Sequence, residues 1–282
     1  MSAPFFHIDF GLPTLLEFRG PDAIRFLNGQ LTQDVRRLVG EEISLPSCIT
    51  DAKGRLQFRV FLTAVADDAI WVSGLAEWRD DLQARLTRYL IADDVEVIDH
   101  TGAFRCIHFT GRIEQVPAGV IARSASRYGF AGTDWWIPQD MEIDLTAIAP
   151  AMDLQELEAW RIAQGIPAWG SELTVGMLPP EAGLEETDIS YQKGCYIGQE
   201  VISRIKSAGK VNRYLSKFSI AADVPADCGV LVDSSARASG EITSISPRAE
   251  GGIRLALGYT KRGAIEFFLR DRAGNLSAVT RI

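Results

Sequence analysis

Apolar and polar positions follow two different periods along the chain, and together the two periods predict a mixed α+β fold. Apolar residues recur at three- and four-residue steps in three places, which predicts amphipathic helices that begin near Pro21, near Leu75 and after Asp153. Between the first two helices, the runs 55–65 and 69–73 are short, rich in Val, Phe, Ile and Leu, and bounded by Gly or Asp. These runs predict strands of a half-buried sheet that pair around positions 67 and 68.

The third predicted helix has the clearest ends. Asp153 and Glu156 form a capping-box pair, and the apolar stripe begins at Leu154. Gly165, followed by a proline two residues later, predicts the end of the helix.

The last part of the chain has a different pattern. From 214 to 282, short apolar runs alternate with turn residues, which predicts a small β-barrel or sandwich. A chain of 282 residues is also too long for one small core. We therefore predict an α+β body at 1–212, with two subdomains at roughly 1–145 and 146–212, and a C-terminal β-barrel domain at 213–282.

Composition restricts the kind of protein. The hydrophobic fraction of 46% and the charged fraction of 23% are typical of globular proteins. We find no apolar run of about 20 residues and no targeting segment at the N-terminus, so we expect a cytoplasmic protein without a membrane partner. The formal net charge of −8 argues against generic nucleic-acid binding, which needs a basic surface.

One stretch opposes this overall charge. Between Lys193 and Lys217, six basic residues accompany a single acid, Glu200. The stretch can be a solvated helix and turn, or a docking surface for a carboxylate or phosphate ligand. The basic residues are Lys193, Arg204, Lys206, Lys210, Arg213 and Lys217.

The four cysteines, Cys48, Cys106, Cys195 and Cys228, stand far apart without CxxC spacing, which argues against a zinc ribbon or a disulfide scaffold. The sequence KGCYIGQE at 193–200 places one of them between two glycines at a predicted helix start. Backbone N–H groups, the helix dipole and Lys193 would there favour the thiolate form of Cys195. The alternative is a small buried cysteine in a tight turn.

The same motif carries a resemblance to a known family. KGCYIGQE at 193–200 with Arg204, and RIAQGIP at 161–167, resemble the signature of the YgfZ family and its mitochondrial relatives. GPDA at 20–23, FLNGQLT at 26–32 and DAKGR at 51–55 resemble the same family's N-terminal helix and following turn.

The resemblance implies a ring-like, aminomethyltransferase-type folate-binding fold with a C-terminal β-barrel and tetrahydrofolate in the central hole. It further implies a protein that assists iron–sulfur client enzymes, including one that thiolates tRNA. On this basis Cys195 is the candidate catalytic residue, and Lys193 and Arg204 would attract the glutamate tail of the folate. The full set of candidate folate contacts is Asn28, Asp51, Lys193, Tyr196, Gln199, Glu200 and Arg204; no metal site is expected.

Two alternatives stay open, and with them the question of whether the protein is an enzyme. Aminomethyltransferases of glycine cleavage, in the same superfamily, use a carboxylate near the folate nitrogen, and Gln57 aligns with it here. Asp51 or Asp134 near that nitrogen would support aminomethyl transfer. Alternatively, Cys195 could ligate a cluster that bridges two proteins.

Overall fold

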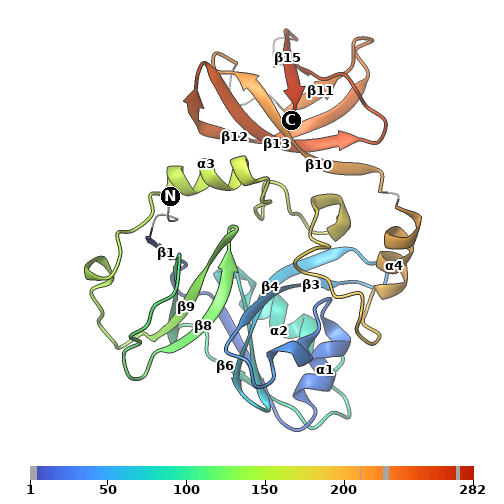
Figure 1. The fold of residues 1–282 in the computed structure, drawn as a ribbon. Helices are drawn as coiled ribbons and strands as arrows, with labels where there is room; N and C mark the ends of the chain where they lie inside the picture. The colour runs from blue at the N-terminus through green and yellow to red at the C-terminus, as the bar shows by residue number, and fades with distance from the viewer. Residues whose placement is uncertain (1–4, 210, 225–228, 271–273) are drawn as a thin grey trace. The chain divides into compact units, whose positions relative to one another are not determined.

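The short apolar runs form strands in both parts of the structure. The computed structural model describes residues 5–209, 211–224, 229–270 and 274–282, and the chain divides into two compact units (Figure 1). The body unit comprises Met1–Met152 and Glu185–Val201, and the barrel unit comprises Asp153–Leu184 and Ile202–Ile282. Lys210 and Cys228 lie outside the described residues.

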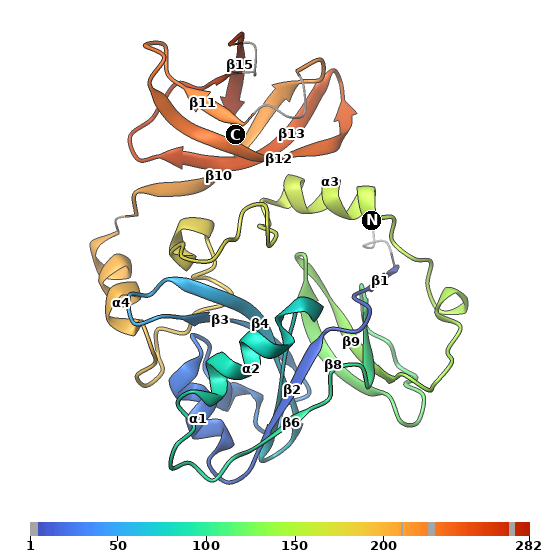
Figure 2. The same cartoon turned by 180° about the vertical axis from the view of Figure 1, so that it is seen from behind.

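A five-stranded antiparallel sheet is the larger sheet of the body unit, in the order β3-β4-β5-β2-β6. The two predicted strands are β4 (Leu56–Ala66) and β5 (Ala69–Gly74), which pair across a tight turn at 67–68 as expected. Seen from behind, β2 and β6 run beside each other (Figure 2). The remaining strands are β2 (Thr14–Arg19), β3 (Ser44–Thr50) and β6 (Glu96–Asp99).

A four-stranded antiparallel sheet, in the order β1-β7-β9-β8, completes the body unit. Trp136 of this sheet meets Trp71 of the larger sheet edge to face, with ring centroids 5.5 Å apart, and Leu15 and Cys106 join the same buried cluster. Each such buried apolar side chain contributes roughly 1.5–3 kcal/mol. The strands are β1 (His7–Asp9), β7 (Phe104–Phe109), β8 (Ile121–Arg127) and β9 (Phe130–Pro138).

The first predicted helix is shorter than its apolar stripe. Helix α1 (Ala23–Gln30) follows its N-cap Asp22, so Pro21 lies outside the helix and not at its first position. Leu31 is already extended, and the chain re-enters helical geometry only in the 3-10 turn η1 (Val35–Leu38). This early end of α1 leaves main-chain carbonyls free for the contacts of the site.

The second predicted helix is α2 (Arg79–Thr87), which follows a 3-10 turn, η2 (Ala76–Trp78). Leu82 and Leu86 of the predicted stripe are buried. Helix α2 contacts β2, and α1 contacts β5, so both helices pack against the five-stranded sheet. A further 3-10 turn, η3 (Leu145–Ala147), lies near the end of the first body segment.

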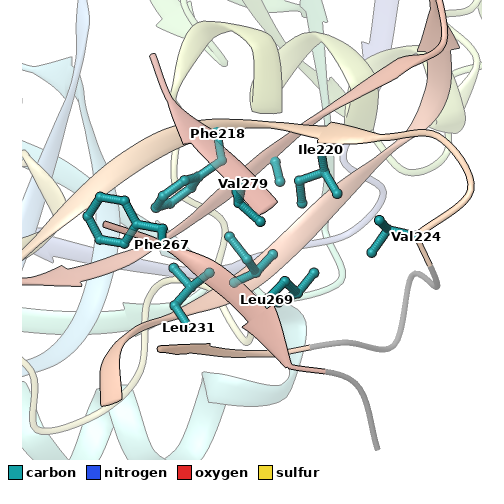
Figure 3. Packing of buried hydrophobic residues seen from close by; sticks show 9 residues of the cluster. Phe218, Ile220, Val224, Leu231, Phe267, Leu269 and Val279 are labelled. Atoms are coloured by element: carbon teal, nitrogen blue, oxygen red, sulfur yellow. The ribbon is translucent and has the colours of Figure 1, made fainter. Parts of the chain in front are cut away.

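The C-terminal strands form a closed barrel in the order β10-β13-β12-β11-β14-β15, which decides between the barrel and the sandwich. Figure 3 shows Phe218, Phe267, Leu269 and Val279 directed toward one another in its core. The strands are β10 (Arg213–Ala221), β11 (Val230–Val232), β12 (Ala238–Glu250), β13 (Ile253–Lys261), β14 (Phe268–Arg270) and β15 (Leu276–Arg281).

Helix α3 (Leu154–Gln164) has the predicted N-cap and C-terminal glycine: the Asp153 side chain accepts two backbone N–H bonds, and Gly165 ends the helix in the left-handed region. The Glu156 side chain of the predicted capping box pairs with Arg248. Leu154 is 79% exposed, so the apolar stripe does not include it. The helix contacts β12 and β13. The sequence predicts that this segment belongs to the body, but residues 153–184 belong to the barrel unit.

A buried ion pair explains that assignment. The Arg161 guanidinium donates to Glu172 at 2.9 Å and to the Ser244 hydroxyl at 2.9 Å. Glu172 accepts in turn from the hydroxyls of Thr243 and Ser244, each at 2.6 Å. These bonds join α3 and the loop after it to β12 of the barrel. Two further elements of the chain are the 3-10 turn η4 (Pro179–Ala182) and α4 (Gln199–Ala208), which begins at the end of the body unit.

Candidate functional site

Two stretches of the body unit that are distant in sequence contact the segment 193–198, which we call the cysteine segment. Ile197 donates its N–H to the carbonyl of Gly29 at 3.2 Å and accepts from the Thr50 hydroxyl at 2.6 Å. Gly198, with a positive φ of 90°, lies so close to Asp51 that an added Cβ would be 2.5 Å from the Asp51 carbonyl oxygen. The end of α1 and the turn after β3 therefore both contact the segment.

Cys195 is the exposed cysteine of this segment. It lies four residues before α4 begins at Gln199, so the predicted position at the helix start is wrong. Cys48 and Cys106 are buried, and burial raises the pKa of both thiols well above the usual value. Of the three cysteines in the described ranges, Cys195 is the one that a reagent or a partner can reach.

Lys193 points into the protein. Its ammonium donates to the carbonyls of Asn28 and Leu31 at 2.6 Å each and to that of Gln33 at 2.8 Å. A lysine has three N–H donors, and these three bonds use them all. The predicted contact between Lys193 and a glutamate tail therefore does not fit this geometry.

Tyr196 is the second buried residue beside Cys195. Its ring lies 5.0 Å from the Lys193 nitrogen. Its hydroxyl is buried and has no hydrogen-bond partner among the described residues, and burial raises the pKa of the phenol. A buried unpaired hydroxyl is costly, so a bound ligand or a water molecule would stabilise this position.

Asp51 and Asn28 each combine a local contact with groups that a ligand can use. Asp51 Oδ1 accepts the N–H groups of Lys53 and Arg55 at 2.8 and 2.9 Å, which leaves Oδ2 outside these two bonds. Asn28 Oδ1 accepts from the N–H of Val35 at 3.1 Å, which leaves its amide N–H₂ outside that bond. Both residues are half-buried in the body unit.

Gln57, which aligns with the carboxylate of the aminomethyltransferases, is held by Arg85. The Arg85 guanidinium donates to Gln57 Oε1 at 2.5 Å, to Gln30 Oε1 at 3.0 Å and to the Thr50 carbonyl at 2.8 Å. Burial lowers the pKa of Arg85. Arg85 thus connects α2 to the end of α1 and to the turn that carries Asp51.

Both carboxylate oxygens of Asp134 are hydrogen-bonded inside the body unit. Its Oδ1 contacts His108 Nδ1 at 2.8 Å, and its Oδ2 accepts two bonds from Arg127 at 2.7 and 3.0 Å. The carboxylate is completely buried. Burial raises the pKa of Asp134, but Arg127 and His108 outweigh this effect and hold it below its usual value. We conclude that Asp134 is a structural charge.

The described basic residues between 193 and 217 differ in burial and belong to two units. Lys193 is buried in the body unit, whereas Arg213 pairs with Glu181 at 2.9 Å and Lys217 donates to the Ala163 carbonyl at 3.2 Å, both in the barrel unit. Arg204 and Lys206 are exposed on α4. The docking-surface interpretation therefore does not extend to Lys193, and it stays a prediction for the exposed Arg204 and Lys206.

The remaining predicted contacts lie in the first turn of α4. Gln199 is half-buried and Glu200 is exposed, and both belong to the body unit. Arg204 follows on the same helix within the barrel unit.

Sequence analysis missed the residues that hold the cysteine segment in place. Arg59 and Asp188 form a bidentate pair at 2.7 and 3.2 Å, and Asp188 is completely buried. The Thr32 hydroxyl also donates to the Asp188 carbonyl at 2.7 Å. These contacts fix the chain that leads into the segment. Arg85 was missed as well, because it lies on the polar face of its helix.

Within the described residues, no three His, Cys, Asp or Glu side chains are grouped so that they could hold a metal ion. Of the helices in the described ranges, none combines the length and the apolar character that crossing a bilayer requires.

Comparisons with known proteins find relatives of the kind that the sequence motifs predict. No protein-family model matches the chain. A tRNA-modifying protein YgfZ from Sodalis glossinidius is 27% identical over 73% of this chain and 68% of its own length, and one from Aliivibrio fischeri is 26% identical over 88% and 82%. A mitochondrial iron–sulfur cluster assembly factor of Mus musculus is 30% identical over 46% of this chain and 37% of its own.

The fold of the chain is similar to that of a solved aminomethyltransferase. The crystal structure of glycine cleavage system aminomethyltransferase T from Bartonella henselae matches with a TM-score of 0.80, over 99% of this chain and 85% of that chain. The sequence identity is 17%, so this likeness establishes the predicted fold class.

Proposed function

We propose that the chain is a YgfZ-type protein that binds tetrahydrofolate and assists the assembly or repair of iron–sulfur clusters, including those of tRNA-modifying enzymes. Its similarity to YgfZ proteins, at 26–27% identity over 73–88% of the chain, and its aminomethyltransferase fold support this proposal. The names of the relatives support the two parts of this role, tRNA modification and cluster assembly. The observation that carries the proposal is the meeting of Asn28, Asp51 and the cysteine segment in the body unit, beside an exposed thiol.

The residues of this region fit a folate in part. The free Oδ2 of Asp51 and the amide of Asn28 can pair with the donors and acceptors of a pterin ring. The unpaired hydroxyl of Tyr196 is a further buried polar group that a ligand can satisfy. We propose Arg204 as the cation for the glutamate tail, because Lys193 has no donor left. Gln199 and Glu200 remain proposed contacts. Tetrahydrofolate, when bound, would supply a carrier for one-carbon units.

The protein's own chemistry in this proposal belongs to Cys195. Its thiol is exposed, whereas those of Cys48 and Cys106 are enclosed. We propose that Cys195 handles sulfur or changes redox state for an iron–sulfur client, for which the cluster is cargo and not a resident cofactor.

Aminomethyl transfer is supported less well. That reaction needs a carboxylate available to the folate nitrogen. Gln57 is uncharged and bound to Arg85, and Asp134 accepts three hydrogen bonds in the protein interior. Of the two candidate carboxylates, Asp51 and Asp134, only Asp51 has an oxygen, Oδ2, that is not used in the hydrogen bonds described above, so an enzyme role would depend on it.

Calorimetric titration of tetrahydrofolate tests the folate proposal. We expect binding by the wild type and by Cys195→Ala, and weaker binding by Asp51→Asn and Arg204→Ala. Two control variants match the site variants. Asp233 accepts two backbone N–H bonds in a turn just as Asp51 does, and Lys206 is an exposed cation two residues from Arg204. Asp233→Asn and Lys206→Ala should bind like the wild type.

The outcomes separate the parts of the proposal. Equal effects of Asp51→Asn and Asp233→Asn would remove Asp51 from the site. If the wild type binds no reduced folate, the folate proposal is wrong, and the protein would act through Cys195 and a partner. Loss of binding in Cys195→Ala would instead make the thiol part of the folate site.

A further inference from the structure

A ring of three main-chain carbonyls surrounds the Lys193 ammonium. The oxygens of Asn28, Leu31 and Gln33 all lie within 2.8 Å of its nitrogen. They come from the end of α1 and the residues after it, where helix carbonyls have no partner in the next turn. A cation at this end also interacts favourably with the helix dipole. The arrangement is that of a cation site whose cation is attached to the chain.

The burial of this lysine is costly. Lys193 is 8% exposed, and the charged or aromatic groups that act on it are Asp34, Arg36 and the ring of Tyr196. Burial lowers the pKa of Lys193 to about 7, with a smaller opposing effect from Asp34. An apolar side chain of similar volume would avoid the desolvation cost. The ammonium therefore serves something other than packing.

The contacts that follow Cys195 in the segment indicate the role of the Lys193 ammonium. Ile197 is bound to Gly29 and Thr50, and Gly198 is packed against Asp51. The chain between these contacts and Lys193 contains only Gly194, Cys195 and Tyr196. Gly194 and Cys195 are exposed.

We infer that Lys193 is a positioning residue for Cys195: its ammonium fixes one end of the cysteine segment in the carbonyl ring, as Ile197 and Gly198 fix the other, so that the thiol is presented at a set place in the body unit. The inference rests on the proposed function only in what it implies about the chemical role of Cys195. The position of the thiol can be measured without folate or a client protein.

A nitroxide spin label on Cys195 measures this directly. The full chain with Cys228→Ser is labelled, because Cys48 and Cys106 are buried. Lys193→Met keeps an unbranched side chain and removes the charge. We expect the mobile fraction of the label to rise about tenfold, the factor that corresponds to one lost charge-assisted hydrogen bond. Lys206→Met removes an exposed lysine on α4 and should leave the spectrum unchanged.

Chemical rescue separates positioning from general loss of structure. In Lys193→Ala, added n-propylammonium can enter the carbonyl ring and donate the missing bonds, so it should restore the unfolding free energy that the substitution removes. Because it is not bonded to the chain, it should leave the label on Cys195 mobile, and tetramethylammonium at the same ionic strength, which has no N–H to donate, should restore neither property. An unchanged label in Lys193→Met, or an immobile spectrum restored by n-propylammonium, would overturn the inference. Failure of folate binding in the wild type would leave these results unaffected.

Discussion

Two segments carry the resemblance of the chain to the YgfZ family, 161–167 and the cysteine segment with its neighbours, and they differ in which of their groups are buried. In the first, Arg161 is buried and bound to Glu172 and Ser244, and Gly165 ends α3 in the left-handed region. In the second, buried Lys193 and Tyr196 flank an exposed thiol, Cys195. One segment directs its polar groups into the protein, and in the other two buried residues lie on either side of an exposed thiol.

The difference shows that the motifs of a family can include residues needed for stability and residues needed for function. The groups of 161–167 are satisfied within the barrel unit, so their contacts account for the motif by stability alone. The cysteine segment contains an exposed thiol that contributes little to packing, so stability does not account for it. The predictions below test this distinction.

The largest loss of unfolding free energy is expected at Asp134, whose buried carboxylate is bound only to groups of the protein itself. Asp134→Asn removes the negative charge between Arg127 and His108 and leaves Arg127 buried without a counter-charge. Breaking a buried pair in this way costs about 3–5 kcal/mol. Urea denaturation should show this loss of unfolding free energy. Asp144→Asn, at the exposed cap of η3, is the control and should change little.

The same carboxylate predicts a pH dependence. Burial raises the pKa of Asp134, but Arg127 and His108 hold it below the unfolded value near 4. The unfolded chain therefore takes up the proton first, so the stabilisation is complete above about pH 4 and is lost as the pH falls further. Wild-type stability should drop more steeply between about pH 4 and pH 2 than that of Asp134→Asn. Identical slopes would contradict this assignment.

The next effect tests the structural segment itself. Arg161→Met removes the cation beside Glu172, which keeps its bonds from Thr243 and Ser244. We expect a loss of about 3 kcal/mol, the lower end for a broken buried pair, and no change in folate binding. Arg248→Met breaks a surface pair with Glu156 and should cost at most about 1 kcal/mol. If Arg161→Met instead lost folate binding and kept the wild-type stability, Arg161 would be a residue of the binding site and not of the scaffold.

These contrasts also show what sequence alone can and cannot predict. The caps of α3, the pairing of β4 with β5 and the C-terminal barrel follow from local patterns of apolar, Gly and Asp residues, and the structure has all three. The error at Leu154 is local as well. Leu154 is the first residue of α3, and its side chain faces solvent, whereas Leu157 is buried.

The site was predicted less completely because its contacts are distant in sequence. From its sequence neighbours, Lys193 would be taken for an exposed cation in a loop. Its burial depends on contacts such as the bond to the carbonyl of Gln33, 160 positions earlier. Arg59 and Asp188 are 129 positions apart, and neither stands in a recognisable motif. Cys195 could be singled out because glycines and a family motif surround it. The residues that hold it could not.

A smaller effect tests the cysteine segment through its two glycines. Gly198→Ala requires a non-glycine residue at φ 90° with its Cβ against the Asp51 carbonyl, and should cost about 1–3 kcal/mol. Gly194→Ala meets no atom within 4 Å at its Cβ and should be nearly neutral. Denaturation measures both, and iodoacetamide alkylation of Cys195 should change only in Gly198→Ala. Equal costs would show that the segment is not held at Gly198.

The smallest effect on stability is expected at the thiol itself. Cys195 is exposed, and a surface substitution such as Cys195→Ser should change the unfolding free energy by no more than about 0.5 kcal/mol. Iodoacetamide should modify Cys195 in the native Cys228→Ser protein and spare Cys48 and Cys106, which burial both encloses and keeps protonated. Peptide mapping by mass spectrometry measures the sites. If Cys195→Ser instead destabilises the protein as strongly as Arg161→Met, the two segments do not differ in kind, and the thiol belongs to the scaffold.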